Sequence, residues 1–155
     1  YVILYLNWYN MKSKLIADEK EKTYAIIFDA GNEVMKGLLD FAEQKDLSAG
    51  NCKAIGAFER VTLGFFDLKK QDYHENKIDE QVEVISLNGD VVLKEGEPKI
   101  HAHVVVAKRD GTAHGGHLIS AIVRPTLKIS LTESPAKLQR KYNEKFGLAL
   151  IDLDA

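Results

Sequence analysis

Residues 98–118 read P-K-I-H-A-H-V-V-V-A-K-R-D-G-T-A-H-G-G-H-L, which combines two closely spaced histidines, an apolar run and a turn signal. The apolar run predicts a strand. Because successive side chains of a strand point to opposite faces, His101 and His103 share one face of the predicted sheet. Residues 109–111 (R-D-G) mark the turn that follows. The stretch therefore predicts a β-hairpin with two histidines on one face of its first strand.

The type of turn decides where a third histidine lies. In a three-residue loop with Gly111 in the left-handed conformation, Lys108 pairs with Thr112. The same register carries His103 directly opposite His117. Three imidazoles then crowd one patch of one sheet face.

A different turn would change this register. A two-residue turn at residues 110–111 shifts the pairing by one residue and moves His117 to the opposite face. A bulge at residues 115–116 (G-G) would move it back. In the first register His114 lies on the other face, beside Val106, and we therefore leave it out of the site.

Three converging neutral imidazoles are typical ligands of zinc or another divalent transition ion, with a coordination position left open. His101, His103 and His117 are therefore the predicted metal ligands. Three partly buried histidines, hydrogen-bonded in an ordinary sheet, would account for the spacing equally well. The reason is that a His-x-His pair with a third histidine lacks the specificity of a four-cysteine site.

Several motifs follow one another in a characteristic order. They are G-A-F at 56–58, L-G-F-F at 63–66, E-V-I-S-L-N-G at 83–89, H-A-H at 101–103 and G-G-H-L at 115–118. In this order they resemble the stand-alone prokaryotic members of the PPC domain family, which is named for its presence in plants and prokaryotes. The resemblance covers the chain from about Thr23 to the C-terminus.

The resemblance implies an α+β domain that forms a homotrimer and binds a metal through histidines matching His101, His103 and His117. It also implies a distant likeness to the fold of acetolactate decarboxylase, a zinc enzyme with a histidine cluster. Plant members carry the domain behind AT-hook DNA-binding motifs, and the DNA-binding label of the prokaryotic members comes from these relatives.

The composition is that of an ordinary soluble globular domain, with 155 residues of which 45% are hydrophobic and 28% charged. The net charge of -2 disfavours binding to nucleic acid through overall charge, although a local basic face stays open. The sequence has no R-G-R-P type AT-hook. The only cysteine, Cys52, fits a reducing cytoplasm and is interpreted as a small buried hydrophobic residue.

The first ten residues, Y-V-I-L-Y-L-N-W-Y-N, differ in character from the rest of the chain. They lack the cationic leader and cleavage site of a secretory signal and are too short to span a bilayer. Met11 with the following K-S-K looks like a natural start. We therefore interpret residues 1–10 as an upstream or non-native extension and residues 11–155 as a single domain; an edge strand or oligomer contact is the alternative.

The remaining patterns predict an α+β fold, mostly antiparallel sheet, with one main helix. The helix is expected at 33–45, where Val34, Leu38 and Phe41 form an apolar stripe. Consecutive strands in sequence favour antiparallel pairing with few helices set to one side. Strands are expected at 14–17, 23–28, 52–58, 60–67, 82–88, 91–93, 100–108, 112–123, 126–132 and 148–153.

Three connecting segments carry separate predictions. Residues 88–90 (N-G-D) predict a hairpin turn. The polar residues 69–80 predict an exposed loop, and a lid over a site is the alternative role of this segment. Ser134-Pro135 predicts the start of a short C-terminal helix that ends at Gly147. This helix would carry a basic set, interpreted as a solvated face or a contact for phosphate or an acidic partner: Lys137, Arg140, Lys141 and Lys145.

A catalytic metal site also needs a general acid or base, ideally a carboxylate near the metal. The candidates are Glu59, after the G-A-F run, and Glu83, which opens the strand before the histidines; each is also a plausible salt-bridge partner. Arg124, before a proline, would hold either an anionic ligand or a structural ion pair.

Three functional hypotheses follow. The first is a trimeric metal-binding protein whose open site takes a small oxygen-rich ligand. A metal in such a site could also support a lyase or hydrolase reaction. The second is a DNA-binding or regulatory protein, which the net charge and the missing AT-hook disfavour. The third is a structural trimer whose metal stiffens the sheet.

Overall fold

The protein is described by a computed structural model that covers residues 4–6, 11–18 and 21–153. In this part of the chain it is a mostly antiparallel β-sheet with one short helix. Its elements are β1 (Leu4–Leu6), β2 (Met11–Asp18), β3 (Lys22–Asp29), α1 (Val34–Gln44), β4 (Ala49–Asp67), β5 (Asp72–Ile78), β6 (Val82–Lys94), β7 (Glu97–Ala107), β8 (Ala113–Glu133), β9 (Gln139–Asn143) and β10 (Leu148–Asp152).

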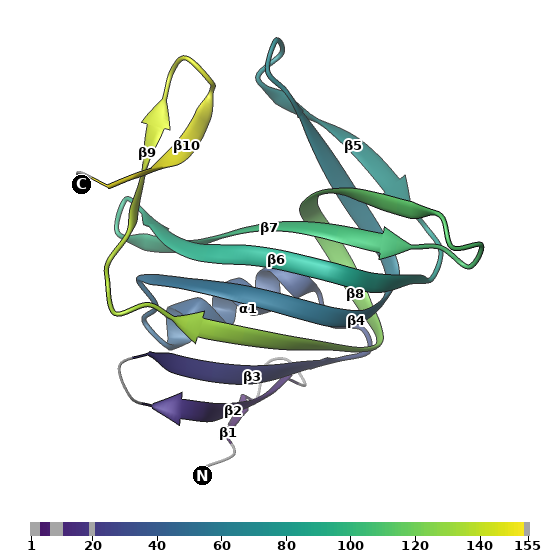
Figure 1. Ribbon diagram of the computed structural model, residues 1–155, viewed down its shortest axis with the longest axis horizontal. Helices are drawn as coiled ribbons and strands as arrows, with labels where there is room; N and C mark the ends of the chain where they lie inside the picture. The colour runs from purple at the N-terminus through teal and green to yellow at the C-terminus, as the bar shows by residue number, and fades with distance from the viewer. Residues whose placement is uncertain (1–3, 7–10, 19–20, 154–155) are drawn as a thin grey trace.

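The strands form one sheet in the order β1-β2-β3-β8-β4-β6-β9-β10. Outside this order, β5 pairs with β4, and β7 pairs with both β6 and β8. Strands β4, β6, β7 and β8 therefore form a closed circuit of hydrogen-bonded pairs. Helix α1 lies against one face of the sheet (Figure 1). The β4–β5 and β9–β10 hairpins both extend beyond the sheet at the top of the same view.

The pattern of β7 shows how the sequence forms the core. Ala102, Val104 and Val106 are at most 2% exposed, whereas the alternate residues His103 and Val105 are exposed. The period-2 pattern thus turns one face of β7 toward the hydrophobic core, as the sequence predicted.

Helix α1 confirms the predicted main helix. Its apolar stripe, Val34, Leu38 and Phe41, is fully buried. Gly37 lets the helix approach the sheet, because a Cβ atom there would lie 2.3 Å from the ring of Phe28. The close approach explains why a glycine, which costs about 1 kcal/mol relative to alanine in a helix, is found there.

Several predicted strands are joined into longer ones. The runs at 52–58 and 60–67 belong to the single strand β4, and those at 112–123 and 126–132 belong to β8. The predicted turn at 88–90 is wrong, because β6 continues straight through it. A Cβ atom on Gly89 would lie 2.8 Å from the His101 carbonyl oxygen, so this glycine serves close strand packing and not a turn.

Two other predictions need correction. The predicted loop at 69–80 contains β5, which is paired along β4 from Val61 to Asp67. Most β5 side chains are exposed, so the strand lacks the alternation that would have identified it.

The predicted C-terminal helix is also wrong. The Ser134 hydroxyl accepts a hydrogen bond from the Ala136 amide, which forms a local turn without a helix. The chain then continues into β9, where the Leu93 amide donates to the Leu138 carbonyl oxygen over 3.0 Å. Pairing with β6 thus outweighs a short local capping signal. The strand expected at the C-terminal end is present as β10.

The N-terminal segment 1–10 is only partly described. Leu4–Leu6 form β1 and pair with β2, while residues 1–3 and 7–10 lie outside the described residues. The interpretation of 1–10 as an extension to a domain at 11–155 stays a prediction. In the described part of the chain, no helix has the length and apolar character needed to cross a membrane.

Candidate metal centre

The turn after β7 has the geometry that aligns the histidines. Gly111 has a φ of +81°, and the Lys108 amide donates to the Thr112 carbonyl oxygen over 2.9 Å. The resulting register pairs His103 with His117 and Val106 with His114. The three-residue loop and its register are therefore confirmed, and His114 lies outside the cluster.

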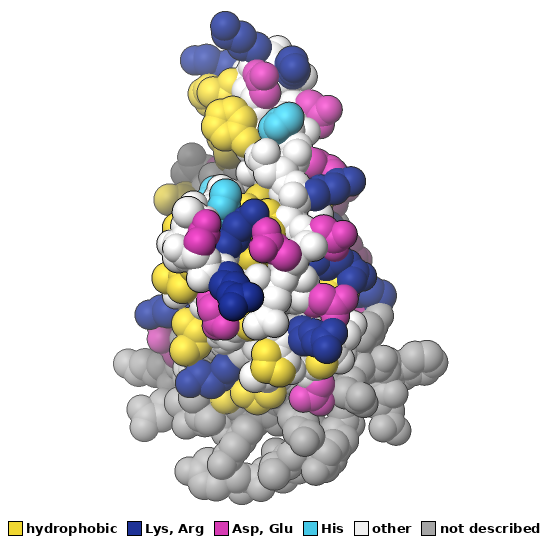
Figure 2. All heavy atoms as spheres, turned by 90° about the vertical axis from the view of Figure 1, so that its right-hand side faces the viewer, with side chains coloured by type: hydrophobic (Ala, Val, Ile, Leu, Met, Phe, Trp, Pro, Cys, Tyr) yellow, Lys and Arg dark blue, Asp and Glu magenta, His cyan; other side chains and the backbone are white. Residues whose placement is uncertain are grey.

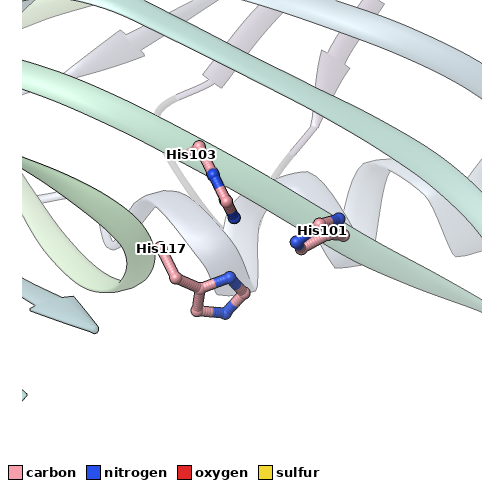
Figure 3. A group of neighbouring side chains, drawn as sticks. All are labelled: His101, His103 and His117. Atoms are coloured by element: carbon pink, nitrogen blue, oxygen red, sulfur yellow. The ribbon is translucent and has the colours of Figure 1, made fainter. Parts of the chain in front are cut away.

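The three side chains converge from two neighbouring strands, His101 and His103 from β7 and His117 from β8 (Figure 3). Their ring centroids are 4.9 to 5.6 Å apart. The candidate ligand nitrogens, one from each ring, all lie within 4.8 Å of one another. We call these three residues the histidine cluster.

Two of the rings have pKa values below that of a free histidine. Desolvation, followed by the charges of His101 and His103, lowers the pKa of His117 to about 4. Desolvation and the charge of His101 also lower the pKa of His103, although Asp90 opposes this. Neutral imidazole is the form that binds a metal ion, so near neutral pH these two rings are ready to act as ligands.

One nitrogen of the cluster is buried and available to bind an ion. The Nδ1 atom of His117 is buried and has no hydrogen-bond partner among the described residues. A buried polar atom in that state costs free energy, unless a ligand or ion satisfies it. The Tyr73 ring stacks on the His117 ring at 4.7 Å and 27°, and thereby covers it from β5.

A charged pair supports the cluster from its other side. His101 Nδ1 lies 3.6 Å from Asp90 Oδ2, and Asp90 Oδ1 accepts a 2.5 Å hydrogen bond from Arg140 Nη2. Burial alone would raise the pKa of Asp90, but interactions with His101 and Arg140 outweigh it and hold that pKa below its ordinary value. Asp90 is therefore a carboxylate at neutral pH.

The arrangement fits a transition metal. Nitrogens bound tetrahedrally to zinc at about 2.0–2.1 Å are about 3.3 Å apart, so the cluster needs to contract by at most about 1.5 Å. Side-chain rotation can supply this, because the rings are half-buried or exposed. Three imidazoles and a buried nitrogen without a partner suit zinc or a similar divalent ion, and three ligands leave a coordination position open.

The structure does not bring the two candidate carboxylates to the histidine cluster. Glu59 forms ion pairs with Arg60 at 2.8 Å and with Arg124 at 3.3 Å. Glu83 is exposed and pairs with Ala107, four residues along β7 from His103, which corresponds to about 13 Å of strand. Arg124 thus has the structural ion pair that was one of its two interpretations.

Three residues around the cluster were not predicted from the sequence as parts of the site: Tyr73, Asp90 and Arg140. Tyr73 and Arg140 lay in segments predicted as a loop and a helix, and Asp90 in a predicted turn. One signal was available for Asp90: with β6 and β7 paired, it lies directly opposite His101. Cys52, in contrast, was interpreted correctly, since it is 3% exposed and desolvation raises the pKa of its thiol to about 11.

Together, these features define a class of protein: a mainly antiparallel β-sheet domain that has one helix in its described residues and three histidines converging from two neighbouring strands. The Plants and Prokaryotes Conserved (PCC) domain matches residues 16–135. The chain belongs to this family, as its motifs indicated.

Solved structures of similar chains share this fold. A "putative DNA binding protein" from Bacteroides thetaiotaomicron is 26% identical, with a TM-score of 0.85 over 92% of this chain and 99% of that chain. The metal-containing protein AF0104 from Archaeoglobus fulgidus is 33% identical, with a TM-score of 0.78 over 88% of this chain and 97% of that chain.

More distant matches cover less. The α-acetolactate decarboxylase of Bacillus subtilis is 14% identical, with a TM-score of 0.50 over 81% of this chain and 58% of that chain, which shows a likeness of fold alone. The Bifunctional protein GlmU of Synechococcus sp. (strain JA-3-3Ab) is 30% identical over 115 residues. That match covers 73% of this chain, but the chain spans only 17% of that protein's length.

Proposed function

We propose that this chain is a metal-binding protein in which His101, His103 and His117 hold zinc or another divalent transition ion. The observation that carries the proposal is the convergence of three imidazoles whose candidate ligand nitrogens lie within 4.8 Å of one another, and the buried Nδ1 of His117 without a partner among the described residues adds to it. A similar chain, 33% identical, is described as metal-containing, which supports the same reading.

The open side of the site would take a small oxygen-rich ligand. A zinc ion in such a site makes bound water acidic or polarises a substrate oxygen, which is the chemistry of hydrolases and of many lyases. The residues of this chain would contribute orientation: Tyr73 covers His117, and Asp90 faces His101. The ion pairs of Glu59 leave it poorly suited to act as a general base from within the same chain.

The proposed assembly is a homotrimer in the cytoplasm. The trimer is an expectation from the family resemblance, and the compartment is an expectation from the single buried cysteine, which suits a reducing environment. Chelation distinguishes this protein from a trimer whose metal only stiffens the sheet. In the structural trimer, removal of the ion would lower the stability of the fold but would not change the binding of a small ligand.

The second candidate is a DNA-binding or regulatory role, which the description of the Bacteroides thetaiotaomicron relative favours. On the face drawn in Figure 2, Lys and Arg side chains are interspersed with Asp and Glu, and the described residues form no continuous basic stripe there. A basic patch or stripe is the typical footprint of a protein that binds the phosphate backbone of DNA. Affinity for duplex DNA that falls steeply with salt concentration would favour this role, and no binding at low salt would exclude it.

Titration with zinc tests the main proposal directly. The metal-free wild-type chain and His103→Ala are titrated in competition with a chromophoric chelator. We expect one site per chain in the wild type and an affinity at least about 100-fold lower in the variant. Equal affinities, or no binding by the wild type, would refute the proposal.

A further inference from the structure

The C-terminal hairpin reaches the histidine cluster through Asp90, although it lies beyond the matched family domain. The match ends at residue 135, and β9 begins at Gln139. β9 pairs in parallel with the end of β6, with Arg140 opposite Lys94. From there the Arg140 side chain reaches back along β6 to Asp90, whose other carboxylate oxygen faces His101.

The contacts of Arg140 differ from those of an ordinary surface arginine. Its side chain is only 12% exposed. Its Nη1 donates to the Ala149 carbonyl oxygen of β10 over 3.2 Å, and its Nη2 donates to Asp90 Oδ1. The guanidinium is thus fixed at both ends, to the hairpin that carries it and to the carboxylate that faces the cluster. A pair held in this way has a defined geometry, unlike an exposed ion pair.

We propose that Arg140 and Asp90 are positioning residues that fix His101 with its Nδ1–H directed at Asp90 Oδ2, 3.6 Å away, and its Nε2 free to bind the metal. The ring nitrogens of a metal-binding histidine have different roles, and the partner of one nitrogen decides which tautomer the other presents. Figure 3 shows one nitrogen of His101 directed toward the other two imidazoles and one directed away. Arg140 acts through Asp90, because it lies against the carboxylate oxygen that does not face His101.

This inference rests on the proposed metal binding, and it makes the C-terminal hairpin a functional part of the metal centre. A second contact links the same hairpin to the arm that carries Tyr73. The Gln71 amide lies 3.4 and 3.5 Å from the carbonyl oxygens of Glu144 and Lys145. The two projecting hairpins therefore touch each other beyond the cluster, one supporting His101 and the other covering His117.

A double-mutant cycle of zinc affinity tests the inference. The variants are Arg140→Met, Asp90→Asn and their combination, each measured by chelator competition, and Lys141→Met is the control because it removes the same charge from an exposed neighbour on β9. We expect Arg140→Met to weaken zinc binding by about 10-fold and Lys141→Met by less than about 2-fold. In the Asp90→Asn background, Arg140→Met should add less than about 2-fold.

Each failure has a separate meaning. Suppose that the wild type binds zinc and Arg140→Met binds it equally well: the positioning role is then refuted and metal binding stands. The same holds if Arg140→Met lowers the zinc affinity by the same factor in the Asp90→Asn background as in the wild type. If the wild type binds no zinc, both proposals fall. Thermal melting of the metal-free variants shows whether each one folds.

A measurement on the wild type alone covers the case in which Arg140→Met does not fold. Nitrogen NMR of the metal-free chain at pH 8 reports the tautomer of each neutral histidine. We expect His101 to carry its proton on Nδ1. A predominant Nε2–H tautomer would overturn the inference.

Discussion

The two faces of β7 use the same segment of chain for opposite purposes. On the inner face, Ala102, Val104 and Val106 are almost completely buried in the core. On the outer face, His101 and His103 meet a third histidine from β8. Because residues alternate between the faces, the core residues Ala102 and Val104 each lie directly beside a candidate ligand in sequence.

This difference suggests that stability and metal binding can be changed separately. Inner-face residues contribute through area removed from water, about 25 cal/mol per Å² of apolar surface. Outer-face histidines contribute little to the fold of the metal-free chain, because one of them is exposed and none is part of the hydrophobic core. Four predictions test this separation, beginning with the largest expected effect.

Val106→Asp should abolish folding of the chain. Val106 is 0% exposed, and the new carboxylate would be buried in the core without a partner, at a cost above about 4 kcal/mol. Circular dichroism and urea denaturation measure the effect. The exposed neighbour Val105→Asp is the control and should remain folded; a folded Val106→Asp protein would contradict the assignment of the two faces.

Removing the metal should lower stability only where the histidine cluster is intact. At a free zinc concentration of 1,000 times the dissociation constant, binding stabilises the folded state by about 4 kcal/mol. Addition of a chelator should therefore lower the melting temperature of the zinc-loaded wild type by several degrees. The melting temperature of His103→Ala should not respond, and an equal response in both proteins would place the ion elsewhere.

The pH dependence of the metal-free chain should reveal the buried ring of His117. Its pKa of about 4 in the folded state lies below the value of about 6.5 expected when unfolded, so the unfolded state binds a proton first. Stability is therefore fully present above about pH 6.5 and declines as the pH falls through about 4. Asp90, with its lowered pKa, contributes mainly below this window.

Urea denaturation of the metal-free wild type and of His117→Gln between pH 7 and pH 4.5 measures this effect. The decline should be shallower in the variant, which has no imidazole to protonate. Parallel curves for the two proteins would show that His117 titrates normally.

Glu59→Gln and Glu83→Gln should have the smallest effect on the cluster. Both residues lie away from it along their strands, and Glu59 is held by two arginines. We expect zinc affinities within about 2-fold of the wild type in chelator competition. A larger loss in either variant would show that the carboxylate reaches the metal, for example from another copy of the chain in an oligomer.

The parts of the fold that the sequence predicted are those governed by local rules. A left-handed glycine at 111 and a three-residue loop sufficed to align His103 with His117. Strand alternation and an apolar helical stripe identified the core. The same local rules failed for β5 and β9. Most residues of β5 are polar and exposed, so the strand shows no alternation, and the conformation of β9 depends on its pairing with β6.

The supporting residues of the site could not be predicted for the same reason. Arg140 and Asp90 are 50 residues apart in the sequence. Tyr73, which stacks on His117, lies on β5, a strand that the sequence pattern did not predict. Such contacts arise from the tertiary pairing of strands. The ligands themselves were accessible because two strands joined by a tight turn carry all three of them.

The metal content of the purified protein tests most directly whether the three histidines bind an ion. Elemental analysis is performed on the wild type and on His103→Ala, both purified without a histidine tag or a chelator. If the three histidines bind the ion, the wild type contains close to one zinc or other transition ion per chain and the variant lacks it. An absence of metal from both proteins, or an equal content in both, would contradict this binding and reduce the three histidines to ordinary residues of the sheet.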